Sequence, residues 1–356
     1  MRPVEIALEA HAELGEGPWW DEQHSQLLWV DLFAGSVHFW DPTTGRDRRI
    51  RLGQPVGMVA RRTSGGLVCA VRDGIAFVES DGSGFEIVAP IEAENVGNRM
   101  NDGACDQAGR LWAGTMAADL SPSQGSLYRV GPDLCATPVL KDVSISNGLD
   151  WSPDGRTFYF TDSSMRRIDA YDFDVETGSI RNGRMLVDLP HPLATPDGMA
   201  VDAEGTIWVA MWDGGCVQRF SPDGHLLETI KVPVTRPTSV AFGGPHLNQL
   251  FITSACAGLT QRQQADEVHA GAIFVLDPGV TGRLPAPFKD DASSAQQWSS
   301  GTGLGSGHAA LSQGPERGRR EGAHGQRPRA ADDDRVDPLV VDVSALLPEP
   351  GPGTAA

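Results

Sequence analysis

Two carboxylates and one carboxamide stand at equivalent places in a repeated sequence pattern. Glu16, Asn147 and Asp197 each lie just before a short apolar run that leads into a polar turn. Carboxylate and carboxamide oxygens are the donors that hard divalent cations prefer, and three protein donors leave coordination positions open for water or substrate. Asp and Asn before Gly are also common turn formers, so one of them alone would indicate little. As a set, they predict an open divalent-cation site.

A second polar group occurs in the segment 98–103, Asn98-Arg99-Met100-Asn101-Asp102-Gly103. Arg99 and Asn101 carry donors and acceptors that suit a polyhydroxylated ligand. We expect both beside the entrance to the cation site, and we expect Asp102 to brace its turn. The alternative for Arg99 is a solvated surface position.

The repeated pattern predicts how these residues are brought together. The position five residues before each turn is held by Glu16, Val56, Asn101, Asn147, Asp197 and Thr238. Successive members are 40, 45, 46, 50 and 41 residues apart. Several short strands in each unit of this length are typical of a β-propeller, whose innermost strands line a central channel. We therefore predict an all-β, six-bladed β-propeller with a central metal site.

The two ends of the chain differ in character. Residues 4–12 predict one strand that completes the last blade and removes its free edge. Residues 1–290 are expected to form the propeller domain. Residues 291–356 are rich in Gly, Ala, Pro, Ser, Arg and Asp, and this low-complexity tail is predicted to be disordered.

Composition excludes several classes of protein. The net charge of −18 disfavours nucleic-acid binding, which needs a basic face. The five cysteines contain no C-x-x-C pair and are expected to be reduced, which suits a cytoplasmic protein. We predict no signal peptide and no membrane span, because the chain lacks an apolar run of sufficient length. We expect a monomer.

Several motifs in the same order give the chain a resemblance to a known family. They are Leu14-Gly15-Glu16-Gly17-Pro18, Arg99-Met100-Asn101-Asp102-Gly103, Gly114-Thr115-Met116-Ala117, Ile145-Ser146-Asn147-Gly148-Leu149-Asp150-Trp151, Pro196-Asp197-Gly198-Met199 and Gly271-Ala272-Ile273-Phe274. Over about residues 5–288 the sequence resembles the gluconolactonase and regucalcin (senescence marker protein) family.

The resemblance implies a six-bladed propeller with one divalent metal in its channel. It implies Glu16, Asn147 and Asp197 as metal ligands, and Arg99, Asn101 and Asp119 as substrate contacts. The matching animal proteins carry Glu where this chain has Asp119. The shorter side chain is expected to alter which sugar hydroxyl is recognised.

These observations predict a metal-dependent sugar lactonase, a carboxylic ester hydrolase that converts an aldonolactone to its aldonic acid. The small-molecule partner would be a gluconolactone-like sugar lactone, and the cofactor would be one Ca, Zn, Mn, Mg or Fe ion. Asp197 is the candidate general base. One alternative is a non-enzymatic calcium-binding regulator on the same fold, and another is a protein-binding platform whose polar ring is only structural.

Overall fold

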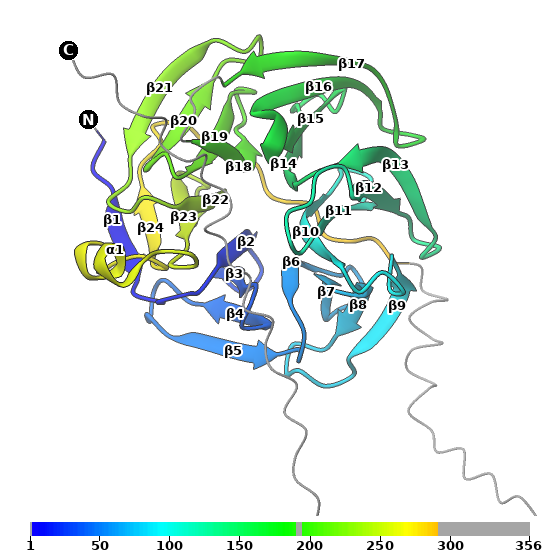
Figure 1. Ribbon diagram of the computed structural model, residues 1–356, viewed down its shortest axis with the longest axis horizontal. Coiled ribbons are helices and arrows are strands. Elements are labelled where there is room, and N and C mark those ends of the chain that lie inside the picture. The colour runs from blue at the N-terminus through cyan, green and yellow to red at the C-terminus, as the bar shows by residue number, and fades with distance from the viewer. Residues whose placement is uncertain (1, 190–193, 291–356) are drawn as a thin grey trace, which may run out of the picture.

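Six four-stranded antiparallel sheets form a ring in the computed structural model, which describes residues 2–189 and 194–290 (Figure 1). The predicted six-bladed propeller is confirmed. The prediction of a disordered tail, 291–356, lies outside the described residues.

Each blade begins with its innermost strand and proceeds outward. Blades one to three are β2 (Gly15–Asp21), β3 (Gln26–Asp31), β4 (Ser36–Trp40), β5 (Asp47–Arg51); β6 (Val56–Arg61), β7 (Leu67–Val71), β8 (Gly74–Val78), β9 (Glu86–Pro90); and β10 (Asn98–Cys105), β11 (Leu111–Ala117), β12 (Gly125–Val130), β13 (Ala136–Val143). Blades four and five are β14 (Ser146–Trp151), β15 (Thr157–Asp162), β16 (Arg167–Asp174), β17 (Ser179–Asp188); and β18 (Thr195–Val201), β19 (Ile207–Trp212), β20 (Cys216–Phe220), β21 (Leu226–Lys231).

The ring is closed by strands from both ends of the propeller. Blade six consists of β22 (Pro237–Gly243), β23 (Gln249–Ser254), β24 (Ile273–Leu276) and, on the outside, β1 (Glu5–Leu8). Glu5 pairs with Val275 and Ile6 with Phe274. The prediction that the N-terminal strand completes the last blade is confirmed, and β24 thereby gains a partner for its outer edge.

Buried aspartates link the turns of the blades to tryptophans of the core. Trp112 Nε1 donates to Asp106 Oδ2 at 2.9 Å, and Trp208 Nε1 donates to Asp202 Oδ2 at 3.0 Å. Asp106 and Asp202 also accept backbone N–H groups of their own turns. Each buried carboxylate is therefore satisfied, and it holds an indole of the next strand in the interior.

Two short helical segments were not predicted from the sequence. The 3₁₀ turn η1 (Ser163–Met165) follows β15. Helix α1 (Gln261–Asp266) lies between β23 and β24 and begins with a capping box formed by Thr260 and Gln263. At six residues α1 is short, and none of the helices in the described ranges could span a bilayer. All five cysteines are unpaired.

After β24, the chain crosses one end of the channel. This segment, residues 277–290, is called the strap, and its later part is drawn in orange across the centre of the ring (Figure 1). Arg283 forms an ion pair with Asp150 at 2.8 Å, and Asp290 forms one with Arg62 at 2.7 Å. The Phe288 N–H donates to the Arg61 carbonyl at 2.8 Å. The strap therefore connects blades that are far apart in sequence.

Candidate metal centre

Irregular pairing in the inner strands marks the shared position of the repeat. We call the residues at this position the ring: Glu16, Val56, Asn101, Asn147, Asp197 and Thr238. In all six, the register with the second strand shifts at or directly after the shared position. In β18, for example, Pro196 pairs with Met211 and the next pair is Met199 with Val209. A bulge disrupts the ladder locally and re-aims side chains. The bulges thus explain how one sequence position in each blade can present its side chain to the channel.

Glycines allow the inner strands to approach closely at this level. A Cβ atom on Gly57 would lie 2.0 Å from the Asn101 carbonyl oxygen. One on Gly148 would lie 2.5 Å from the Asp197 carbonyl oxygen. Real Cβ atoms do not make such contacts, so larger residues would push neighbouring blades apart and widen the ring.

The three predicted donors are buried at the centre of the propeller. Relative exposure is 6% for Glu16, 6% for Asn147 and 4% for Asp197. Asp197 Oδ1 is buried and has no hydrogen-bond partner among the described residues. An unpaired buried carboxylate oxygen is costly unless a cation or proton reaches it. This orphaned oxygen fits a ligand position.

The amide of Asn147 is held by a residue that the sequence analysis missed. Asn147 Nδ2 donates to Ser163 Oγ at 2.8 Å, and Ser163 Oγ donates to the Pro196 carbonyl at 2.7 Å. The carbonyl oxygen of the amide therefore faces Asn101, whose Nδ2 lies 3.2 Å away. Ser163 belongs to η1, and the repeat pattern contains no signal for it because it comes from a loop.

The electrostatics of the ring show surplus negative charge. Burial, followed by the nearby Asp197 and Asp102 carboxylates, raises the pKa of Glu16 well above its usual range. Burial, followed by Asp102, does the same for the pKa of Asp197, although hydrogen bonds from the Gly198 backbone and the Asn147 side chain oppose it. Burial also lowers the pKa of Arg99 to about 10. A divalent cation would relieve this repulsion.

Counting only His, Cys, Asp and Glu side chains, no group of three in residues 2–189 and 194–290 is arranged to hold a metal ion. The ring instead combines two carboxylates with the amide oxygen of Asn147. Such an all-oxygen set fits a hard cation.

Arg99 lies at the ring and is not a solvated surface residue. Its Nη1 donates to Asn101 Oδ1 at 2.6 Å and to the Met100 carbonyl at 3.1 Å. Asn101 in turn donates from Nδ2 to the Ser146 carbonyl at 2.8 Å. Asn101 thus bridges Arg99 and Asn147, which suggests that it orients both groups. Its predicted contact with substrate stays a prediction.

Asp119 is an exposed residue of a turn. Its carboxylate is exposed and accepts the Ser121 N–H at 3.0 Å, so it caps the turn that follows β11. Such local hydrogen bonding is common for Asp in turns and competes with longer-range contacts. Its role as a substrate contact stays a prediction.

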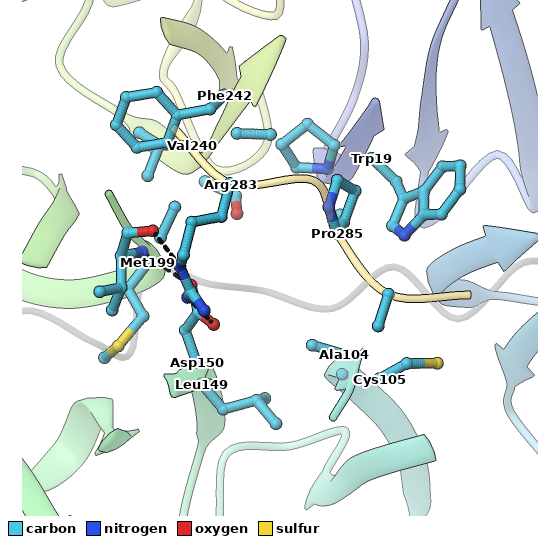
Figure 2. Close-up of a pocket in the computed structure, with 18 of the residues that line it drawn as sticks. Trp19, Ala104, Cys105, Leu149, Asp150, Met199, Val240, Phe242, Arg283 and Pro285 are labelled. Carbon is cyan, nitrogen blue, oxygen red and sulfur yellow. Dashed lines mark hydrogen bonds and ion pairs between the residues drawn. The ribbon is translucent and has the colours of Figure 1, made fainter. Parts of the chain in front are cut away.

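Beneath the ring lies a cavity of about 130 Å³ that the strap helps to line (Figure 2). Asp102 lines this cavity and accepts the Gly103 N–H at 2.7 Å. It therefore does more than brace its turn. Burial raises the pKa of Asp102 to about 6. The strap residues Arg283 and Pro285 also line this cavity.

Blade one contains a second arrangement that resembles catalytic machinery. Ser36 Oγ lies 3.0 Å from His38 Nε2, and His38 Nδ1 lies 2.6 Å from Asp47 Oδ2. Ser36 is 1% exposed, and His38 is stacked on Trp29. A nucleophile needs room for a reacting carbonyl, and this serine has none. We interpret the group as a structural hydrogen-bond network.

Comparison with known proteins matches residues 14–256 to the model of the SMP-30/Gluconolactonase/LRE-like region. Regucalcin of Homo sapiens is 38% identical over 292 residues, which cover 80% of this chain and 98% of that protein. A calcium-binding protein, regucalcin, from Agrobacterium tumefaciens has a solved structure with a TM-score of 0.78 and 29% identity, covering 81% of this chain and 97% of the other. A luciferin-regenerating enzyme gives a TM-score of 0.76 and 33% identity, covering 81% and 100%.

Proposed function

Because the chain belongs to the SMP-30/gluconolactonase/LRE-like family, we propose that it is a metal-dependent lactonase that hydrolyses a sugar lactone to its aldonic acid. The observation that carries the proposal is the all-oxygen donor set, in which the buried Asp197 Oδ1 lacks a partner in the described part of the chain. Glu16, Asn147 and Asp197 would hold the ion. A bound divalent cation would supply Lewis-acid polarisation of the lactone carbonyl.

The residues of the chain would carry the remaining steps. Arg99 would hydrogen-bond and orient the hydroxylated substrate, with Asn101 keeping the guanidinium in place. Asp197 would accept a proton from the water that attacks the carbonyl carbon. When the ring C–O bond breaks, the leaving oxygen would take up that proton and become the hydroxyl of the aldonic acid. Water, protons and charge then balance without a further reactant.

The second candidate is a calcium-binding regulatory protein without enzymatic activity. The description of the Agrobacterium protein as calcium-binding favours it, and the same donor set would serve it. The two functions differ in turnover, since both would bind metal.

The deciding experiment is a lactonase assay on chelator-treated protein across gluconolactone, xylonolactone, arabinonolactone and galactonolactone. Ca, Zn, Mn, Mg and Fe would be added back one at a time. We expect turnover of at least one lactone to return with metal. Asp197→Asn should lose it, while the exposed Asp81→Asn serves as the matched control. Tight metal binding without turnover of any lactone would favour the regulatory function.

A further inference from the structure

Aromatic side chains stand at or just after two strand ends on the metal side of the propeller. Phe33 comes two residues after Asp31, which pairs with Gly15 beside Glu16. Trp212 ends β19, where it pairs with Thr195 close to Asp197. Both aromatic residues are partly exposed. They therefore lie at the level of the metal ring, on blades one and five.

The aromatic side chains of Phe33 and Trp212 rest on one small apolar cluster, separate from the larger cores between blades. Its buried members are Leu14, Leu32, Ala255 and Ala257, and Phe33 and Trp212 pack against it. Leu14 also forms an isolated bridge with Ala255, which joins blade one to blade six. The two aromatic side chains are thus held by the same backbone that positions Glu16.

Each of the two aromatic side chains also lies next to an arginine. The Arg99 guanidinium carbon lies 5.7 Å from the centroid of Phe33, and that of Arg236 lies 4.8 Å from the centroid of Trp212. Arg236 is neutralised by Asp213 at 2.6 Å. For Arg99, the hydrogen-bond acceptors are an amide and a backbone carbonyl. The contacts from Phe33 through Arg99 and Asn101 therefore lead directly to Asn147 of the donor set.

We propose that Phe33 and Trp212 form an aromatic wall that takes the C–H face of a pyranose-type sugar ring and so determines which lactones bind. The proposal rests on the lactonase function above. A sugar ring offers hydroxyls at its edge and C–H groups on its face, and the C–H groups pack on the negative face of an aromatic ring. Arg99 and the wall together provide a polar and an apolar contact of this kind.

Binding of a stable glycoside tests the wall independently of turnover. The probe is methyl β-D-glucopyranoside, titrated calorimetrically into the full, metal-loaded chain. Phe33→Ala and Trp212→Leu should each weaken binding roughly three- to tenfold. Phe33→Leu keeps apolar bulk beside Arg99 and should still lose affinity, whereas Phe33→Tyr should retain it. Phe85→Ala, an exposed phenylalanine between β8 and β9, is the matched control and should bind normally.

Kinetics with the best lactone give a second readout. In Phe33→Ala the KM should rise by the same factor, with kcat within about twofold and metal content unchanged. Wild-type affinity in Phe33→Leu, or the absence of saturable glycoside binding by the wild-type chain, would overturn the wall. Glycoside binding that depends on Phe33 without any lactone turnover would instead refute only the lactonase function.

Discussion

Replacement of Asp102 by asparagine should stabilise the metal-free protein at neutral and alkaline pH. Burial raises the pKa of Asp102 to about 6 from its usual 3.8. The folded state therefore retains a proton that the unfolded chain has lost, and stability falls as pH rises from about 4 to 6. Above pH 6 the destabilisation reaches its full value, at most about 3 kcal/mol at 1.36 kcal/mol per pKa unit. The partial exposure of Asp102 to the channel reduces this figure.

Asparagine has the same size and keeps an oxygen for the Gly103 N–H, so the substitution removes mainly the charge. Urea unfolding of chelator-treated protein at pH 4 and pH 8 would measure the difference. We expect Asp102→Asn to gain about 1–3 kcal/mol at pH 8 and a small fraction of that at pH 4. Asp81→Asn should gain nothing, because a hydrogen-bonding serine lowers the pKa of that exposed carboxyl. An equal gain at both pH values would refute this electrostatic reasoning.

Three further predictions concern the ring and the strap. Asp197→Asn should retain some metal but lose at least about a hundredfold in kcat, and a wild-type rate in the metal-saturated variant would exclude its role as base. Arg99→Ala should lower kcat/KM about tenfold or more across the lactone panel with unchanged metal content, and unaltered kinetics would remove it from the site. Truncation after Asp290 should leave the melting temperature nearly unchanged. Truncation after Pro278 removes the fully buried Phe288 and should lower the free energy of unfolding, measured in urea, by about 3 kcal/mol or more. Equal melting temperatures for the two truncations would show that the strap does not stabilise the fold.

The repeat made the blades and the ring predictable from sequence. Its period defines the six inner strands, and the shared position identifies Glu16, Asn147 and Asp197 without knowledge of any contact. This is possible because equivalent positions of the innermost strands lie at the same height along the channel of a propeller. The N-terminal strand was predicted separately, from the need to cover the free edge of the last blade, and it does pair with β24.

Residues that act outside the repeat could not be found in this way. Ser163 holds Asn147 from a loop, and the loop has no counterpart pattern to align. The path of the strap across the channel was not predictable either, because its contacts with Arg61 and Asp150 join positions more than a hundred residues apart. Asp119 was predicted from the resemblance and not from the repeat; its carboxylate accepts a hydrogen bond from its own turn, and its role as a substrate contact stays a prediction.

The arrangement separates stability from chemistry. The hydrophobic clusters lie within and between blades, and the polar side chains of Glu16, Asn147 and Asp197 add no apolar surface to them. The ring residues sit at bulges, where the ladder is already interrupted. Their substitution should therefore alter metal affinity and charge while the blades stay folded. Because buried carboxylates repel one another without a cation, the metal-free ring opposes folding, and bound metal should raise the melting temperature in proportion to the logarithm of its concentration. A variant that loses metal binding should also lose this dependence of the melting temperature on metal concentration. If its strands stay intact, the metal site is not required for the propeller to fold.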